Sequence, residues 1–312
     1  MTLKVRLYIL LTSAIVLASC SSNDVETTVE KTAVKINLAA GIDQLTARGA
    51  TDLLQNSLSV NSRVAIYINE MTSTTPTVTY LQPMHYRATN TNGDLAPVTG
   101  NAPYYPMNGN YIEVVGFYPY SAATSAGGSF TMGNKQVEKA DYEANDLMSA
   151  SVVGRDENNA LVLSFKHLCS KISYHLTTSQ ENVRLISSKV KLLNVKKTAL
   201  LNAPEGKIVS VVGGSENDIL ISNDGSKDGS GVILPQTILA NTRFIEIELL
   251  TKETVYGVMP TTYTFLPGKS YVFNIDVKVD RQTSVLNLTN IEVVDWVDAY
   301  SDPQEIVAEK TE

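Results

Sequence analysis

Apolar and polar residues alternate in short stretches along most of the chain beyond residue 33. The clearest stretch is Tyr271–Val279, where Asn274, Asp276 and Lys278 fall between apolar residues. A period of two residues is typical of a strand that buries one face and leaves the other in water. The same period occurs in Val34–Leu38, Val64–Ile68, Leu161–Phe165, Ile172–Leu176 and Ile245–Leu249. The sequence therefore predicts half-buried strands of antiparallel sheets.

Turn-forming residues separate these stretches. They include Asn92-Gly93, Asn108-Gly109, Gly127-Gly128, Gly213-Gly214, Asn223–Gly225 and Pro267-Gly268. Helical periodicity is weak, and we expect only short helical turns, near Gly49–Leu58 and Asp141–Leu147. Many short strands joined by polar turns are typical of β-sandwiches, so we predict an all-β fold. No period of 20–50 residues repeats, which argues against solenoids and propellers.

Apolar density between the strand-like stretches is lowest at Thr177–Asn182. We place a domain boundary there, which predicts one β-sandwich over residues 34–180 and a second over residues 181–312 with an acidic tail. The chain has 312 residues, of which 43% are hydrophobic, so it can fill two cores of ordinary size.

The first 20 residues have the pattern of a bacterial lipoprotein signal. Lys4 and Arg6 precede the largely apolar run Leu7–Ala18, which is too short to span a bilayer comfortably. Leu17-Ala18-Ser19-Cys20 matches the lipobox, so we expect residues 1–19 to be removed and Cys20 to carry acyl chains such as palmitate. Residues 20–33 would then be a lipidated tether. An ordinary signal peptide with a cysteine nearby by chance is the alternative.

Charge and cysteine content exclude several classes of function. The net charge is −7, and an acidic surface argues against a nucleic-acid partner, which needs Lys and Arg to neutralise phosphates. Cys169 is the one cysteine besides Cys20, so the lipidated chain has no pair for a disulfide or a Cys-based zinc site. We expect Cys169 to be a small buried hydrophobe.

Catalytic and metal-binding signatures are missing from the sequence. There is no nucleophile elbow, His-Glu-x-x-His, Walker loop or Rossmann fingerprint. His167 and His175 would lie about 26 Å apart on one extended strand, too far to share a metal unless a turn falls between them. With His85, we interpret them as isolated polar positions. We therefore predict no catalytic residues, no metal site, no cofactor and no enzymatic activity.

Two groups of residues leave a choice of interpretation. Asp141, Glu143 and Asp146 form an acidic set, for which we favour a solvated loop over a calcium site because the spacing is not that of an EF-hand. The tyrosines of Pro103–Pro106 and Phe117–Tyr120 could stack on sugar rings, but such rings more often cover the rim of a core, which we favour.

The order of several motifs resembles that of the fimbrillin family, the FimA-type and Mfa-like subunits of Bacteroidetes type V pili. The matching stretches are Tyr104-Tyr105-Pro106, Val114–Tyr120, Asp146–Ala150, Leu161–Leu168, Phe265–Tyr271 and Trp296. Met148 replaces a leucine of the family pattern, and Cys169 precedes its Ser-Lys-Ile. The resemblance covers about residues 34–300 and the lipobox.

This resemblance implies two transthyretin-like β-sandwich domains and a structural role in a cell-surface fimbrium that supports adhesion and biofilm formation. It implies export as a lipoprotein to the outer membrane, followed by cleavage by an Arg-specific protease after the first strand. The best match to the cleavage site is Arg48-Gly49, with Arg63 as a rival. Removal of the first strand would open a groove for a strand from another fimbrial subunit.

The physical argument for strand exchange rests on Val34–Leu38. If this strand leaves, it exposes an unpaired sheet edge and an open core, which is a template for strand addition. Candidate donor residues, which could equally close their own domain, are Val277, Val279, Leu286 and Leu288. Residues 297–312 are too polar to resemble an inserted strand, so the role of the subunit as stalk, tip or anchor stays open. The alternative is a monomeric surface lipoprotein that binds a glycan or a host protein.

Overall fold

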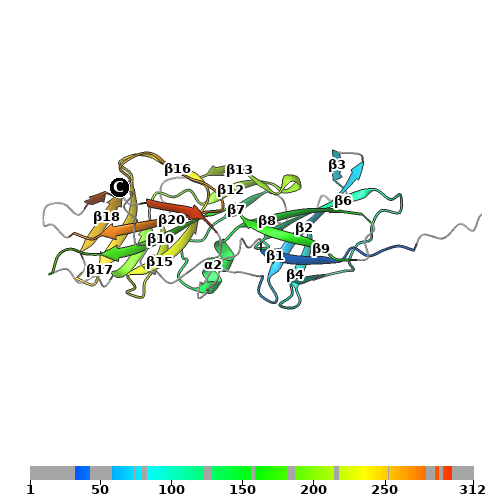
Figure 1. Cartoon of the computed structure of the whole chain (residues 1–312), viewed down its shortest axis with the longest axis horizontal. Helices are drawn as coiled ribbons and strands as arrows, with labels where there is room; N and C mark the ends of the chain where they lie inside the picture. Colours follow the sequence, from blue (N-terminus) through cyan, green and yellow to red (C-terminus); the bar gives the residue numbers. More distant parts are fainter. Residues whose placement is uncertain are drawn as a thin grey trace, which may run out of the picture. The chain divides into compact units, whose positions relative to one another are not determined.

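A computed structural model describes residues 32–42, 58–72, 75–78, 83–121, 128–155, 159–181, 187–213, 218–251, 253–278, 285–287 and 291–296 (Figure 1). These residues are mostly β-strands, together with the short helix α2 (Lys139–Asn145) and the 3-10 turn η1 (Ala203–Glu205). The predicted all-β fold is confirmed. In this part of the chain, no helix has the length and apolar character needed to cross a membrane.

The first group of strands forms one sheet that closes on itself. Its strands are β1 (Leu38–Ile42), β2 (Arg63–Thr72), β3 (Thr75–Val78), β4 (Met84–Ala88), β5 (Asp94–Pro97), β6 (Tyr111–Tyr118), β8 (Met148–Gly154) and β9 (Leu161–His167). Their order is β3-β2-β4-β5-β1-β9-β8-β6, and β2 also pairs with β6. Hydrogen bonding thus runs in a ring through seven of the strands, with β3 alongside β2. Closure of this kind removes free sheet edges.

The prediction of purely antiparallel sheets is wrong at specific pairs. β1 runs parallel to β9, with Leu38 beside Leu161 and Ile42 beside Phe165. The strands β10 (Ser170–Thr177) and β20 (Lys269–Asp276) are also parallel. Parallel partners need a long crossover connection, so local alternation of residues cannot reveal them.

The ring encloses a hydrophobic core. It contains Ile36, Leu38, Val64, Ile66, Tyr86, Ile112, Leu161, Leu163 and Phe165, among others. Along β9 buried and exposed residues alternate as predicted. β2 differs, because Val64–Asn69 are all buried. Its second face, with Ala65 and Tyr67, packs against a separate cluster instead of facing water.

The second group of strands forms two facing sheets. One has the order β15 (Asp228–Ile233), β10, β20, β22 (Ile291–Asp295), and the other has β14 (Ile219–Ser222), β11 (Ser187–Leu192), β17 (Arg243–Leu249), β18 (Thr254–Val258), β21 (Val285–Asn287). Tyr174 and Phe273 from the first sheet share a core with Val190 and Ile247 from the second. This is the layered packing of a β-sandwich.

β9 is the last strand of the ring, and β10 is the first strand of the two facing sheets. Leu168 and Cys169 connect them. The boundary predicted at Thr177–Asn182 lies beyond β10, which pairs with β15 and β20. We therefore propose Leu168–Cys169 as the division between the two groups of strands.

A third hydrophobic cluster joins the two groups. Ala65, Tyr67, Val115 and Phe117 of the ring pack with residues from beyond it, which are Phe130, Met132, Tyr142, Leu147, Cys169, Ala199, Leu201, Ala203, Val232, Leu234 and Trp296. Part of this cover is the small sheet of β7 (Ser129–Thr131), β12 (Thr198–Asn202) and β13 (Lys207–Val212). Two further short strands, β16 (Gln236–Ile238) and β19 (Tyr263–Phe265), pair with each other.

The third cluster makes the outer face of β6 part of a core. Replacing Phe117, which is fully buried, with alanine should lower the free energy of unfolding by about 3–5 kcal/mol, because it removes buried surface and leaves a cavity. The matched control is Tyr111→Ala on the same strand, where the ring is 49% exposed and the loss should stay under about 1 kcal/mol. Urea unfolding measures both, and equal losses would contradict this packing.

Candidate functional site

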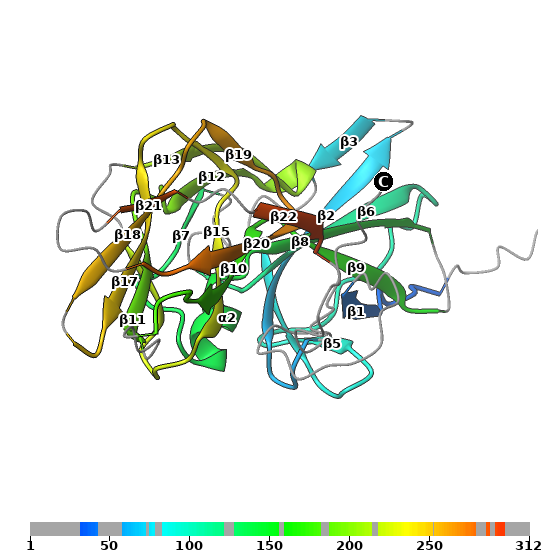
Figure 2. The ribbon, with the colours of Figure 1, turned by 60° about the vertical axis from the view of Figure 1, so that its left-hand side comes forward.

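Residues 34–42 fill a slot between β5 and β9 (Figure 2). Leu38 and Ala39 pair with Leu95 and Asp94 of β5 on one side. On the other side, the whole of β1 pairs with Leu161–Phe165 of β9. β1 is therefore the strand that completes the hydrogen-bonded ring at this point.

The side chains of this segment explain why it stays in the slot. Ile36, Leu38, Ala40 and Ile42 are 1–8% exposed, while Lys35 and Asn37 between them are exposed. Full burial of an isoleucine or leucine side chain contributes roughly 1.5–3 kcal/mol. The predicted alternation from Val34 is confirmed, and it continues through Ala40 and Ile42, beyond the end that the sequence analysis assigned.

The residues before β1 are held by a loop. The backbone N–H of Ile36 donates to Pro103 O at 2.8 Å, and the N–H of Tyr105 donates to Val34 O at 2.9 Å. Lys35 and Tyr104 form an isolated antiparallel bridge. The tyrosines divide accordingly: Tyr105 is buried in the ring core, and Tyr104 lies at the rim with 49% of its surface exposed.

Gly93 allows the turn between β4 and β5 to lie in close contact with the backbone of β1. The N–H of Ala40 donates to Gly93 O at 2.7 Å. Gly93 has φ +86°, and a Cβ placed there would overlap the carbonyl oxygen of Ala40. Only glycine combines this backbone conformation with such close contact. Sequence analysis noted Asn92-Gly93 as a turn but missed its contact with the first strand.

If residues 34–42 leave, the facing edges of β5 and β9 lose their partners and the core side chains beneath lose their cover. The result is an apolar groove flanked by unpaired backbone groups. Such a groove accepts an extended segment by strand addition, with alternate side chains entering the core.

The predicted processing and lipidation residues lie outside the described residues. These are Cys20, Arg48 and Gly49, together with the signal at 1–19. The rival cleavage residue, Arg63, is the first residue of β2. Its backbone is paired opposite Arg87 of β4, and its carbonyl oxygen accepts a hydrogen bond from the N–H of Tyr120 at 2.8 Å. A protease would have to break this ladder to reach it.

The histidines lie at separate places in the described structure. His167 Nδ1 lies 2.9 Å from Asp146 Oδ1, and its ring stacks on Trp296 at a centroid distance of 3.8 Å. His175 Nδ1 lies 2.5 Å from Asp228 Oδ1. His85 stacks on Tyr120. Burial and the neighbouring Arg63 guanidinium lower the pKa of His85. Among the residues that the structure describes, no cluster of His, Cys, Asp or Glu could hold a metal ion.

The solvated loop predicted for the acidic set is wrong. Asp141 Oδ2 accepts hydrogen bonds from the N–H groups of Val137 and Glu138, both at 3.1 Å, and so caps the start of α2. Asp146 is 3% exposed and pairs with His167. The expectation of a helical turn near Asp141–Leu147 is confirmed by α2, whereas all but Leu58 of the turn expected near Gly49–Leu58 lies outside the described residues.

Cys169 is fully buried, as predicted. Its thiol donates to the carbonyl oxygen of Asn145 at 3.6 Å, and burial raises its pKa well above the usual value. A thiol that stays protonated is a poor nucleophile, so this residue acts as a packing group.

Comparison with known proteins adds an independent observation. A family model described as fimbrillin-like matches residues 46–296. "Putative fimbrium subunit Fim1C" of Bacteroides uniformis is 25% identical over 148 residues, which are 46% of this chain and 48% of that protein. The chain therefore spans about half the length of this curated relative.

Solved structures share the fold. A putative cell adhesion protein from Bacteroides ovatus matches 84% of this chain and 96% of its own with a TM-score of 0.59 and 17% identity. One from Bacteroides uniformis matches 84% of this chain and 98% of its own with a TM-score of 0.56 and 17% identity. These similarities show a common arrangement of strands.

The contact at Gly93 can be tested with a matched pair of variants. Gly93→Ala and Gly100→Ala both place alanine at positive φ, which costs about 1–2 kcal/mol, but an added Cβ meets other atoms only at Gly93. Gly93→Ala should therefore lower the free energy of unfolding by more than Gly100→Ala, and it should speed amide exchange at Ala40. Urea unfolding and hydrogen exchange measure these effects. Equal effects of the two variants would show that β1 does not depend on this contact.

Proposed function

The chain belongs to the fimbrillin-like family, and from this premise we propose that it is a structural subunit of a cell-surface fimbrium that polymerises by strand exchange. The observation that carries the proposal is the position of β1. It is the first described strand, it completes the ring between β5 and β9, and its apolar side chains fill the ring core. A partner strand with the same alternation would restore both interactions.

In this proposal, export as a lipoprotein determines when strand exchange takes place. In this proposal Cys20 is acylated, the chain reaches the outer membrane, and β1 keeps the ring closed during transport. A protease that cuts after Arg48 then releases the lipid together with β1. The released subunit has no tether and an open groove, so it is ready to accept a strand from another subunit.

Arg48 is preferred over Arg63 as the cleavage site for a structural reason. Arg63 is exposed, but its backbone belongs to β2 and is bonded to β4 and to Tyr120. Cutting there would damage the strand that connects β4 with β6 in the ring. A cut after Arg48 leaves β2 whole and removes β1 together with the residues before it.

The end of the chain that donates a strand is also part of the proposal. Val277, one of the predicted donor residues, is buried in the core of the second group of strands, and Leu286 lies in β21 beside β18. Val279 and Leu288 lie outside the described residues. β22 is a further candidate, because it is the edge strand of its sheet, next to β20, and leaves Val293 and Val294 45% and 44% accessible.

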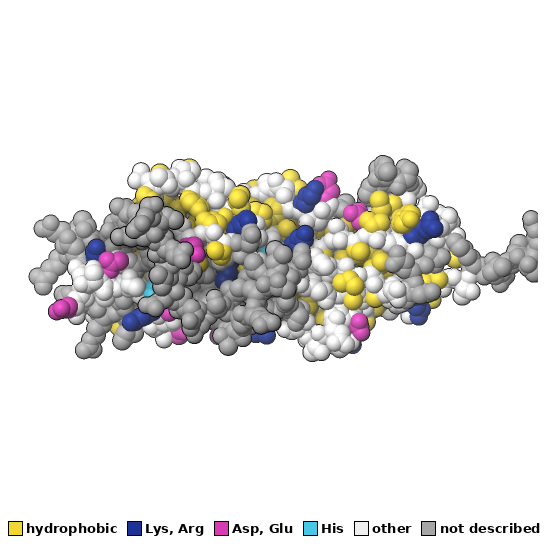
Figure 3. All heavy atoms as spheres, in the orientation of Figure 1, with side chains coloured by type: hydrophobic (Ala, Val, Ile, Leu, Met, Phe, Trp, Pro, Cys, Tyr) yellow, Lys and Arg dark blue, Asp and Glu magenta, His cyan; other side chains and the backbone are white. Residues whose placement is uncertain are grey.

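The predicted structural role involves no catalysis. The side chains of β1 that face the ring core are apolar, charged side chains are scattered over the face of the molecule that Figure 3 draws, and the event at the site is the exchange of one strand for another. Adhesion would follow from assembly into a surface fibre. We propose no cofactor and no nucleic-acid partner.

Cleavage can be tested on assembled surface material from cells that make the protein. N-terminal sequencing should give Gly49 as the first residue. The Arg48→Ala variant should remain acylated, full-length and monomeric, because β1 stays in the slot. The matched control, Arg63→Ala, should be processed and assembled normally. Assembled material that starts at Cys20 or Val64, or normal assembly of Arg48→Ala, would overturn this route.

A further inference from the structure

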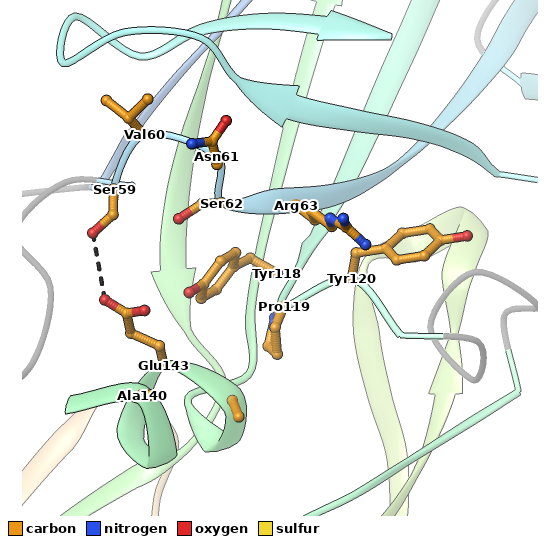
Figure 4. Close-up of a pocket in the computed structure, with 11 residues that line it drawn as sticks. Ser59, Val60, Asn61, Ser62, Arg63, Tyr118, Pro119, Tyr120, Ala140 and Glu143 are labelled. Atoms are coloured by element: carbon orange, nitrogen blue, oxygen red, sulfur yellow. Dashed lines mark hydrogen bonds between the residues drawn. The ribbon is translucent and has the colours of Figure 1, made fainter. Parts of the chain in front are cut away.

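A cavity of about 330 Å³ lies beside the start of β2 (Figure 4). Its wall comes from the segment before and into β2, from the end of β6 and the residues after it, and from α2. The lining residues include Ser59, Ser62, Arg63, Tyr118, Tyr120 and Glu143. This wall combines hydroxyl groups, aromatic rings, a guanidinium and a carboxylate around one hollow.

Arg63 lines the cavity, and a second arginine, Arg87, lies opposite it beside the lining residue Asn61. Arg63 of β2 and Arg87 of β4 are direct cross-strand partners. Side chains in such a pair start about 4.5–5.5 Å apart, and like charges there destabilise the sheet. In the described part of the chain neither guanidinium has a carboxylate partner; Arg87 Nη1 donates to Asn61 Oδ1 at 3.4 Å.

The neighbourhood offers no free carboxylate among the described residues to balance this charge. His85 faces Ala65 in the same strand pair, and its ring stacks on Tyr120 at 3.8 Å. His85 Nε2 is buried and has no hydrogen-bond partner among the described residues. The carboxylate in the wall, Glu143, is already engaged, because it accepts from Ser59 Oγ at 3.4 Å and lies 3.6 Å from Lys139 Nζ.

An uncompensated arginine pair is unusual in a chain with a net charge of −7. Guanidinium groups bind carboxylates with paired, directional hydrogen bonds. We propose that this cavity is a binding site for an acidic saccharide, whose carboxylate meets Arg63 and Arg87 and whose ring enters the hollow. The hydroxyl group of Ser62 and the ring of Tyr120 suit the polar edge and apolar face of a sugar.

The size and position of the cavity fit this ligand. Its volume is at the lower end of the range for small-molecule sites, which matches one sugar unit. The site goes beyond strand exchange and does not depend on it, because Arg63 lies after the proposed cleavage residue and would remain in the assembled subunit. It would give the fibre a ligand for adhesion.

Saturation-transfer NMR and calorimetric titration of the full chain test the site. The probes are glucuronic acid and N-acetylneuraminic acid, with glucose as the neutral comparison and acetate as the simple anion. Both acidic sugars should bind, glucose and acetate should bind at least tenfold more weakly, and rising salt should weaken binding. Loss of one charged hydrogen-bonding partner typically costs tenfold or more in affinity, so Arg63→Gln and Arg87→Gln should each show that loss.

The control variant is Arg155→Gln, which removes the same charge from an exposed arginine that lies over Tyr111 instead. It should bind the acidic sugars as the parent chain does. The thermal unfolding temperature should be unchanged in Arg155→Gln and should not fall in Arg63→Gln or Arg87→Gln, since these side chains are exposed and loss of one charge relieves the repulsion between the two arginines. Equal binding of glucose, full affinity in Arg63→Gln and Arg87→Gln, or equal losses in Arg155→Gln would each overturn the site. Equal binding of acetate, or tighter binding of an Asp/Glu-rich peptide, would overturn the saccharide assignment.

The strand-exchange proposal is tested separately, by N-terminal sequencing of the fibre. The outcome of that test does not depend on sugar binding, so either proposal can fail without the other.

Discussion

Closure of the hydrogen-bonded ring by β1 is the constraint on which the rest of the structure depends. The ring has no free edge while β1 pairs with β5 and β9, and its core is covered while Ile36, Leu38, Ala40 and Ile42 point inward. A short strand near the start of the chain is thus responsible for both edge protection and core coverage. Any segment that supplies equivalent backbone groups and side chains can take its place.

The remaining packing keeps the molecule intact when the ring opens. The outer faces of β2 and β6 are buried in a cluster with residues from beyond the ring, among them Trp296 and Cys169. The second group of strands has its own core, built from two facing sheets. These two clusters do not include β1, so their contacts persist without it. In the proposed strand exchange, this separation would keep the rest of the subunit folded between the loss of β1 and the arrival of a partner strand.

Much of the strand content could be predicted from residue alternation, but pairing could not. Leu161–Phe165 alternates cleanly and behaves as expected, because one face meets the core and the other meets water. β1 lies parallel to β9, which is more than 100 residues later, and no local pattern encodes that partner. For β2 the signal was present: Val64–Ile68 is apolar at every position, which is typical of a strand covered on both faces.

For the candidate sites, too, the sequence predicted individual features but not the contacts between distant residues. The importance of the first strand was predictable from its apolar face, whereas the contacts that hold it, such as Gly93 with Ala40, depend on tertiary approach. Asp146, at the end of α2, was assigned to solvent because its partner, His167 at the end of β9, is 21 residues away. The opposition of Arg63 and Arg87 is likewise a matter of register, since each arginine alone is an ordinary surface residue. Sequence identified the residues, and only the fold identified their neighbours.

The most direct test of the central claim is amide hydrogen exchange at Asp94–Pro97 and Leu161–Phe165, the two strands that flank β1. It should be compared in the uncut chain, in the cut subunit before assembly, and in the assembled fibre. The account predicts slow exchange, then fast exchange, then slow exchange again, as the slot is filled, emptied and refilled. Slow exchange in the cut, unassembled subunit, or fast exchange in the fibre, would contradict the claim that β1 closes a ring which a neighbouring subunit completes.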